Sequence, residues 1–550
     1  MNCTNCGAEI APGAKFCTGC GQTVPAAESV TPVEEVVTPV EEVAAPVEET
    51  AAPAAKLDLN AIKTELIATV SPIAKKLKPI FTNKKVLMGI AGAVALILII
   101  GIISAIASAN NGYIKLKQTT MAIHNGDDVS IVVNNKVLSD TIDSDSTPST
   151  SSSLNGKVTA LLTDEGDLYV INGKKIVKVD EDVEDFQLSA SGKGLAYVID
   201  EDDEYTMKLY TVSSKKDVTV TDELYSLNYA ISPDGKSVVY MVDDDDETEV
   251  MYFKGKDSTK VASDVESILG LSNNGKYIYV VSENDDGESI LYSYNKKGER
   301  ENLGDIDSDT VRFNDDHTQI MFYHDDKTYI SNKGKDAEKA ASDTLRLVMA
   351  PTSQSASSGY ATTYPVSSLF DHVYYGDDAW LIKKNAEKNI KLVSNVSHCT
   401  LDETAEYLYY VHDYEELQVL QISKGKNAYA KAKTLAEDIS NYVVTSDRKL
   451  VYFISDETLY SVNGKKGGTA RKITNDDVES YFLAINGKDV VYYIMDGDAY
   501  ACSNGKKGTK VVTDAVATSS SPTGVAYIMS EDALYATNGS KKPKSILTVD

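Results

Sequence analysis

The sequence predicts an all-β repeat domain that follows one membrane-spanning helix and a small N-terminal metal-binding module. Three observations lead to this prediction: two cysteine pairs near the N-terminus, an uncharged apolar run at 86–109, and a short polar turn motif that recurs about every 40 residues. They divide the 550 residues into a small N-terminal part and a large C-terminal part.

The N-terminal module, residues 1–22, contains two C-x2-C pairs, and a glycine follows each second cysteine. The four cysteines are Cys3, Cys6, Cys17 and Cys20. Two thiolates three residues apart bind one side of a tetrahedral ion, so we expect these four to hold one structural Zn²⁺. A disulfide pair or two redox motifs are the alternatives, which a cytosolic location disfavours. So short a segment has no core of its own, and the metal would supply its folding free energy.

This module resembles the short zinc ribbons at the N-termini of many Gram-positive membrane proteins, in its Cys3–Gly7 and Phe16–Gly21 segments. The resemblance implies metal ligands and no reaction. Lys15 is the one basic residue in 1–22, so we expect no nucleic-acid binding and instead a possible cytosolic protein partner.

Residues 23–57 follow as a linker of seven-residue repeats, each with a proline and a Val-Glu-Glu triplet. Proline in every repeat forbids a continuous helix and favours an extended, disordered tether. Residues 58–85 place apolar residues at helical spacing and end in five lysines, which predicts an amphipathic basic juxtamembrane segment. A helix on a partner protein is the alternative for this segment.

The run 86–109 has 24 residues without a charge, and as a helix it would rise ~36 Å, enough to cross a bilayer. Because the lysines precede it, we expect a signal anchor in the plasma membrane, with a cytoplasmic N-terminus and an extracytoplasmic C-terminal domain. Ala107–Ala109 form an A-x-A triplet of the kind that signal peptidase cuts, so cleavage after it is the alternative.

Residues 110–152 are expected to be an extracytoplasmic stalk with short strands, and residues 153–550 a β-propeller. Ser232–Lys236 reads Ser-Pro-Asp-Gly-Lys, and Ser189–Lys193 and Ser272–Lys276 are copies that stand before Val/Tyr-rich strands. A period near 40 built from short strands is typical of propeller blades. This motif resembles the WD40-like repeats of the TolB type, and the resemblance implies the fold only. We expect one large ring, with seven or eight blades as the first choice, or two rings divided near 343–370.

Charge restricts the partners of the C-terminal domain. The chain has 54 Lys+Arg and 82 Asp+Glu, of which residues 1–112 hold 8 and 10, so residues 113–550 carry a net charge of −26. Such a domain will not bind nucleic acid through bulk electrostatics. The acidic residues gather in loops, where Ca²⁺ binding is one interpretation and solvation the favoured one. Asp305, Asp307 and Asp309 imitate the start of a calcium loop, but Thr310 stands where that loop needs glycine.

No catalytic motif stands out, and four of the six histidines gather in 317–398 without metal-ligand spacing. Cys399 and Cys502 are expected to be free thiols, and the 33 tyrosines to be mostly structural. We therefore expect a non-enzymatic, membrane-anchored envelope protein whose propeller binds a protein or glycan ligand as a scaffold or sensor. The alternative is a propeller-type extracellular hydrolase that acts on glycan through carboxylates in the central channel.

Overall fold

The computed structural model describes Ile114 and most of residues 117–548, all within the second of the two compact units of the chain, Ala95–Asp550. The exceptions within that range are 126–127, 202–203, 245–246, 308–310, 349–355, 359–360, 364–365, 385–388, 403, 423–431, 475–476, 485–488, 521–524 and 538–541. The expected zinc ligands Cys3, Cys6, Cys17 and Cys20 and the expected span 86–109 lie outside the described residues. Within the described part, no helix is long and apolar enough to cross a bilayer.

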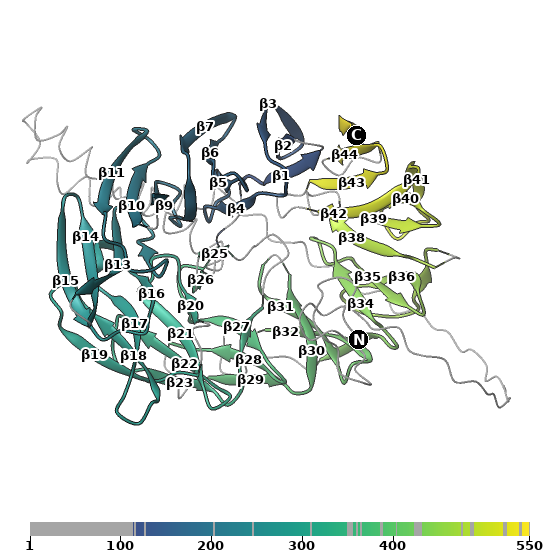
Figure 1. The fold of residues 1–550 in the computed structure, drawn as a ribbon. Helices are drawn as coiled ribbons and strands as arrows, with labels where there is room; N and C mark the ends of the chain where they lie inside the picture. Colours follow the sequence, from purple (N-terminus) through teal and green to yellow (C-terminus); the bar gives the residue numbers. More distant parts are fainter. Residues whose placement is uncertain are drawn as a thin grey trace, which may run out of the picture. The chain divides into compact units, whose positions relative to one another are not determined.

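The described chain forms eleven antiparallel sheets, which follow one another in chain order as the blades of a propeller (Figure 1). Blade 1 has three strands, β1 (Thr120–Asn125), β2 (Asp128–Val133) and β3 (Lys136–Asp143). Blades 2 to 5 have four strands each: β4 (Ser149–Ser152), β5 (Val158–Leu162), β6 (Leu168–Asn172), β7 (Lys175–Asp180); β8 (Val183–Leu188), β9 (Gly194–Glu201), β10 (Glu204–Thr211), β11 (Lys216–Thr221); β12 (Ala230–Ile231), β13 (Ser237–Asp244), β14 (Glu247–Lys254), β15 (Asp257–Ser263); β16 (Ser267–Leu271), β17 (Ile278–Glu283), β18 (Ser289–Tyr294), β19 (Arg300–Asp305). A 3-10 turn, η2 (Asn273–Gly275), lies between β16 and β17.

Blades 6 to 8 contain an insertion. Their strands are β20 (Val311–Phe313), β21 (Gln319–His324), β22 (Lys327–Asn332), β23 (Glu338–Ala341); β24 (Arg346–Leu347), β27 (His372–Tyr375), β28 (Ala379–Ile382), β29 (Ile390–Val393); β30 (Val396–Leu401), β31 (Tyr407–His412), β32 (Glu416–Gln421), β33 (Lys433–Ala436). Between β24 and β27, the hairpin β25 (Ala356–Ser358) and β26 (Ala361–Thr363) pairs in parallel with β20, and β25 also contacts β4 of blade 2 (Figure 1). The stretch near 343–370 is therefore an insertion within one ring.

Blades 9 to 11 complete the domain. Their strands are β34 (Asn441–Val444), β35 (Leu450–Ser455), β36 (Thr458–Asn463), β37 (Arg471–Lys472); β38 (Ser480–Ala484), β39 (Val490–Met495), β40 (Asp498–Cys502), β41 (Thr509–Val512); β42 (Ala515–Ser520), β43 (Ala526–Ser530), β44 (Ala533–Thr537), β45 (Lys544–Thr548).

The core lies between neighbouring blades rather than within them. In β9, Leu195, Tyr197 and Ile199 pack against blade 2, whereas Ala196 and Val198 pack against blade 4. Successive residues of a strand point to opposite faces, so a strand that reads as a continuous apolar run is buried on both sides. This explains why the second strand of each blade is rich in Val, Ile and Tyr and has no alternation.

The last blade packs against the first. Ile123 and Val132 of blade 1 share a core with Val525, Tyr527 and Leu534 beside or within blade 11. On its other side, blade 1 packs on β5 and β6 of blade 2. The ring is therefore closed and has eleven blades, more than the seven or eight that were the first choice from the sequence. The segment expected to be a stalk, 110–152, contains β1–β3 and so supplies a blade of the ring.

A bulge recurs where the third and fourth strands of a blade pair. The register shifts between Leu291 and Tyr292 in blade 5 and between Leu534 and Tyr535 in blade 11. Bulges sharpen the local twist, which a blade needs in order to splay outward from the ring. The Leu-Tyr pair that recurs in the sequence is thus the position of this bulge in these two blades.

Candidate functional site

The two faces of the ring are defined by its topology. In a four-stranded antiparallel blade, the hairpins between strands one and two and between strands three and four lie at one end. The hairpin between strands two and three lies at the other end, together with the segment that leads to the next blade. We call the first end the lysine face and the second the acidic face, for the residues described below.

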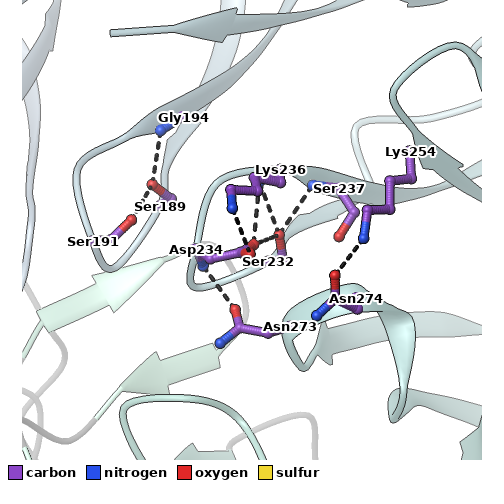
Figure 2. A network of polar contacts seen from close by, with 10 residues as sticks. All are labelled: Ser189, Ser191, Gly194, Ser232, Asp234, Lys236, Ser237, Lys254, Asn273 and Asn274. Atoms are coloured by element: carbon purple, nitrogen blue, oxygen red, sulfur yellow. Dashed lines mark hydrogen bonds and ion pairs between the residues drawn. The ribbon is translucent and has the colours of Figure 1, made fainter. Parts of the chain in front are cut away.

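The turn motif Ser232–Lys236 lies on the lysine face (Figure 2). The Ser232 hydroxyl accepts hydrogen bonds from the backbone amides of Lys236 (3.2 Å) and Ser237 (3.1 Å) and donates one to Asp234 Oδ1 (2.9 Å). Ser189 accepts from Lys193 and Gly194 in the same way, both at 3.1 Å. The motif serine therefore satisfies buried amides at the start of the second strand, and this role is structural.

Consecutive turns also contact one another. The Ser191 amide donates to the Pro233 carbonyl at 2.9 Å. The Asp234 amide donates to Asn273 Oδ1 at 2.9 Å, as Figure 2 shows. A Cβ on Gly194 would lie 2.1 Å from the Gly235 carbonyl oxygen, so these turns meet backbone to backbone and leave no room for a side chain. The glycines of the repeat fix the spacing of neighbouring blades.

The opposite face is acidic. The hairpins between strands two and three carry, among described side chains, the following carboxylates: Asp164, Glu165 and Asp167; Asp200; Asp243; Glu283, Asp285, Asp286 and Glu288; Asp325 and Asp326; Asp377 and Asp378; Asp413, Glu415 and Glu416; Asp456 and Glu457; Asp496 and Asp498; Glu531 and Asp532. Lys327 is the one basic residue in these same hairpins, and its Nζ lies 3.2 Å from Asp325 Oδ2.

Some of these carboxylates are paired at the base of the hairpin. Lys178 Nζ lies 2.8 Å from Asp167 Oδ2, and Lys391 Nζ lies 2.5 Å from Asp378 Oδ2. In each case a fourth-strand lysine reaches the start of the third strand of its own blade. The carboxylates at the hairpin tips, such as Asp286 and Glu531, are exposed and extend this negative charge into solvent.

A groove of about 690 Å³ lies on the acidic face between blades 2 and 3. Its lining is Leu162, Thr163, Asp164, Glu165, Gly166, Asp182, Val183, Glu184 and Asp200. The Gly166 carbonyl accepts from the Val183 amide at 2.9 Å and joins the two sides of the groove. The Ser144 hydroxyl, 2.7 Å from Asp164 Oδ1, lowers the pKa of that carboxyl. Asp164 is thus held in its ionised form, and the five carboxyl side chains of the lining make the groove suitable for a cationic ligand.

Within the described ranges, no group of three or more His, Cys, Asp or Glu side chains is arranged to hold a metal ion. Asp305 and Asp307 instead lie around an imidazole: His324 Nδ1 is 2.8 Å from Asp307 Oδ1, and His324 Nε2 is 3.7 Å from Asp305 Oδ2. On the innermost strands that the structure describes, the carboxylates are Glu184 and Asp185 of β8. The strand register shifts at Glu184, whose exposed side chain lines the groove, whereas Asp185 is half-buried beside Tyr229 and burial raises its pKa, so the two carboxyls lie in different surroundings.

The other residues singled out in the sequence are mostly structural. Cys399 and Cys502 are not in a disulfide, as expected, and burial raises the pKa of the Cys399 thiol. Burial lowers the pKa of both His317 and His372 to about 4, so both imidazoles are neutral inside the blades. Nine tyrosines are among the largest fully buried side chains: Tyr197, Tyr229, Tyr279, Tyr374, Tyr409, Tyr410, Tyr452, Tyr492 and Tyr493. The expectation that tyrosines are mainly structural holds for these nine.

Comparison with known families identifies the N-terminal module. The zinc-ribbon domain family matches residues 2–24, a range that includes the four N-terminal cysteines. No curated protein matches the chain. The N-terminus is therefore a zinc ribbon at the level of the family, and the larger domain is an all-β propeller of eleven blades.

Solved structures are similar to this chain only at low identity and low TM-score. A putative TolB from Agrobacterium tumefaciens is 20% identical over 35% of this chain and 79% of that one, with a TM-score of 0.27. Dipeptidyl peptidase 4 of Porphyromonas gingivalis is 12% identical over 73% and 59%, with a TM-score of 0.31. A structure titled as the eukaryotic initiation factor is 11% identical over 65% and 96%, with a TM-score of 0.37. Likeness at this level carries no conclusion about activity.

Proposed function

We propose that this chain is a single-pass membrane protein of the bacterial envelope, whose extracytoplasmic propeller is a binding module or scaffold and whose zinc ribbon is cytosolic. The main support for a binding role is the acidic face. Hairpins from ten different blades bring carboxylates to one side of a rigid closed ring, with Lys327 as their single lysine in the described part. The ligand class that this face fits is a cationic protein segment.

The acidic face acts on a charged partner before the two are in contact. A surface with one sign of charge raises the local concentration of an oppositely charged partner and speeds its association. The groove between blades 2 and 3 adds a concave site where a lysine or arginine side chain can meet Asp164, Asp182 and Asp200 together. Because exposed charge pairs are screened by salt, binding of this kind weakens as ionic strength rises.

The anchor in this proposal rests on the run 86–109 and on the lysines that precede it. Its test is the activity of a cytosolic reporter, which we expect at a fusion to Met1 and not at a fusion to Asp550. The reverse pattern would contradict the orientation. A released fragment that begins near Asn110 would show that Ala107–Ala109 is cut.

The binding role is tested by capture from membrane extracts with residues 113–550 as bait. A variant with Asp164→Asn, Asp182→Asn and Asp200→Asn should lose the captured partner. The matched variant changes three carboxylates on other blades: Asp413→Asn, Asp456→Asn and Asp496→Asn. If the matched variant keeps the partner, the binding site is the groove, and if it loses the partner equally, the groove is excluded as the specific site. Elution by salt is expected. Turnover of cell-wall glycans or peptides that is abolished by Glu184→Gln or Asp185→Asn would instead establish the hydrolase alternative.

A further inference from the structure

The lysine face carries pairs of adjacent, exposed lysines in the hairpins between strands three and four. Five such pairs are described: Lys174 with Lys175, Lys215 with Lys216, Lys296 with Lys297, Lys465 with Lys466, and Lys506 with Lys507. In the part of the chain that the structure describes, none of these ten lysines lies in an ion pair. Single exposed lysines of the turn motifs, Lys157, Lys193, Lys236 and Lys276, lie at the same end of the blades.

These lysines form a continuous arc around part of the ring. The arc begins in blade 9 and continues through blade 10. It crosses the point where blade 11 meets blade 1, through Lys542 of blade 11 and Lys136 of blade 1, and extends to blade 5. Carboxylates are also present on this face. Asp234 and Asp447 lie near Lys236 and Lys449, respectively. Asp257 of blade 4, Glu299 of blade 5 and Asp489 of blade 10 also lie at this end, and blades 6 to 8 carry Asp315, Asp316, Asp336, Asp371 and Glu406. From blade 9 to blade 5, the lysines named above outnumber the described carboxylates of this face. The positive arc therefore covers blades 9 to 5 and is centred on blades 1 and 2.

The chain joins the ring at the middle of this arc. The Lys117 amide donates to the Asn155 carbonyl at 2.9 Å, and Gln118 Nε2 donates to the Lys157 carbonyl at 3.3 Å. Both acceptors belong to the turn of blade 2 on the lysine face. Eight residue steps separate Lys117 from Ala109, the last residue of the apolar run, and an extended chain covers at most ~29 Å over them.

From this arrangement we infer that the lysine arc is a membrane-docking surface, which lies on the anionic phospholipid headgroups of the leaflet that the chain leaves. This inference rests on the proposed anchor at 86–109. It orients the ring, with the lysine face toward the bilayer and the acidic face toward solvent and toward its partner. We assign a lipid surface as the occupant because residues 110–116, which connect the proposed span to the ring, keep the lysine face within ~29 Å of the bilayer.

The net charge of the domain does not oppose this docking at physiological salt. The second strand of blade 3 has eight residues and that of blade 5 has six, so the two faces are ~20–26 Å apart. The Debye length is ~8 Å at 0.15 M ionic strength, so a headgroup at the lysine face is screened from the acidic face. At 0.01 M salt the Debye length is ~30 Å, and repulsion from the whole domain then reaches the membrane.

The test uses residues 113–550, whose ring closes through its own cores, with vesicles of phosphatidylcholine alone or mixed with phosphatidylglycerol. We expect cosedimentation with the mixed vesicles only, and binding that is strongest near 0.1 M salt and weaker at both 0.01 M and 0.5 M. Because this fragment lacks 86–109, its result does not depend on the anchor. Extraction of the full chain from membranes by alkaline carbonate tests the anchor separately.

Two variants with the same change of charge test whether the lysine face is the surface that docks on the membrane. Lys174→Glu, Lys296→Glu and Lys506→Glu together should weaken binding to the mixed vesicles at least ten-fold. The same charge change on outer strands away from this face, with Lys339→Glu, Lys472→Glu and Lys510→Glu, should alter it less than two-fold. Equal losses in both variants, or no binding by the unchanged fragment near 0.1 M salt, would overturn the proposal. Binding to soluble polyphosphate without binding to vesicles would also overturn it, because the arc would then recognise a soluble polyanion.

Discussion

The hydroxyl of Tyr527 in β43 donates a hydrogen bond to the backbone carbonyl of Asn134, in the hairpin between β2 and β3, 393 residues earlier in the chain. This contact joins the last blade to the first. No strand from the C-terminus enters the first sheet in the described residues, so the ring closes through side chains and one shared core rather than through a mixed sheet. Closure therefore depends on blade 1 as a unit.

Deletion of blade 1 should open the ring. Without residues 117–143, the apolar side chains of Val525, Tyr527 and Leu534 lose their partners on one side, and those of Leu161 and Ile171 lose theirs on the other. We expect a fragment of residues 147–550 to aggregate or to unfold at much lower denaturant than residues 113–550, as followed by circular dichroism. Tyr527→Phe alone should cost only about 1 kcal/mol, since it removes one hydrogen bond. A truncated fragment with an unchanged unfolding midpoint would contradict this account of closure.

Ser232 of the turn motif should contribute more to the free energy of unfolding than an exposed serine of the same size. Ser232→Ala removes the acceptor for the amide of Ser237, and it leaves the amide of Lys236 with Asp234 Oδ1, 3.3 Å away, as its acceptor in the turn. Such a loss costs about 1–3 kcal/mol of unfolding free energy. The matched control is Ser214→Ala, an exposed serine in a hairpin of the same face, for which we expect a change below about 0.5 kcal/mol. Chemical denaturation of both variants measures the difference, and equal effects would show that the turn hydroxyl is dispensable.

The blade was predictable from the sequence because its signals are local. Ser232, Gly235 and the Val/Tyr run after them mark a turn and a buried strand within ten residues, and copies at a regular interval indicate a ring. The number of blades was not predictable in this way. Blade 1 has no Ser-x-x-Gly-Lys turn, because its three strands lack the first hairpin, and blade 7 is interrupted by the insertion that contains β25 and β26.

The separation of charge between the faces is also present in the sequence, but it was not among the expectations drawn from it. Along the chain, acidic hairpins such as Asp285–Glu288 alternate with basic ones such as Lys296–Lys297. Only the order of strands within a blade tells that these two hairpins lie at opposite ends. A net charge of −26 conceals this pattern, since an average over the domain carries no direction. Asp200 and Asp243, which were expected in loops, lie at the ends of β9 and β13, and the common face of the acidic hairpins required the topology.

The zinc ribbon should fold only with its metal. A peptide of residues 1–24 is expected to bind one Zn²⁺ and to lose its structure with a chelator, because Cys3, Cys6, Cys17 and Cys20 would supply the core that so short a chain lacks. Cys17→Ser should abolish this folding, whereas the neighbouring change Thr18→Ser should leave it intact. Cobalt absorption and circular dichroism give the two readouts. Equal folding of Cys17→Ser without metal would refute the assignment of the ligands.

Two buried groups in one turn should give opposite contributions to stability in acid. Burial lowers the pKa of His317 to about 4, below its unfolded value of 6.5, so the folded protein binds fewer protons there than the unfolded chain. Its stabilising contribution is complete above pH 6.5 and is lost as the pH falls toward 4, by about 3 kcal/mol. Burial, together with the neighbouring Asp316 charge, raises the pKa of Asp315 to about 6, above its usual value of 3.8. Its contribution therefore has the opposite sign, and stability is gained as the pH falls from 6 toward 4.

Unfolding free energies measured from pH 7 to pH 4 should separate these two contributions. His317→Asn is expected to flatten the loss of stability in acid, and Asp315→Asn to steepen it, whatever each change does to stability at pH 7. The imidazole of His317 should also keep its neutral-form NMR shifts down to about pH 5, because neither ring nitrogen has a hydrogen-bond partner among the described residues in its buried site on Phe313. Titration of that imidazole above pH 6, or the same slope in both variants, would show that burial in this turn does not control its protonation.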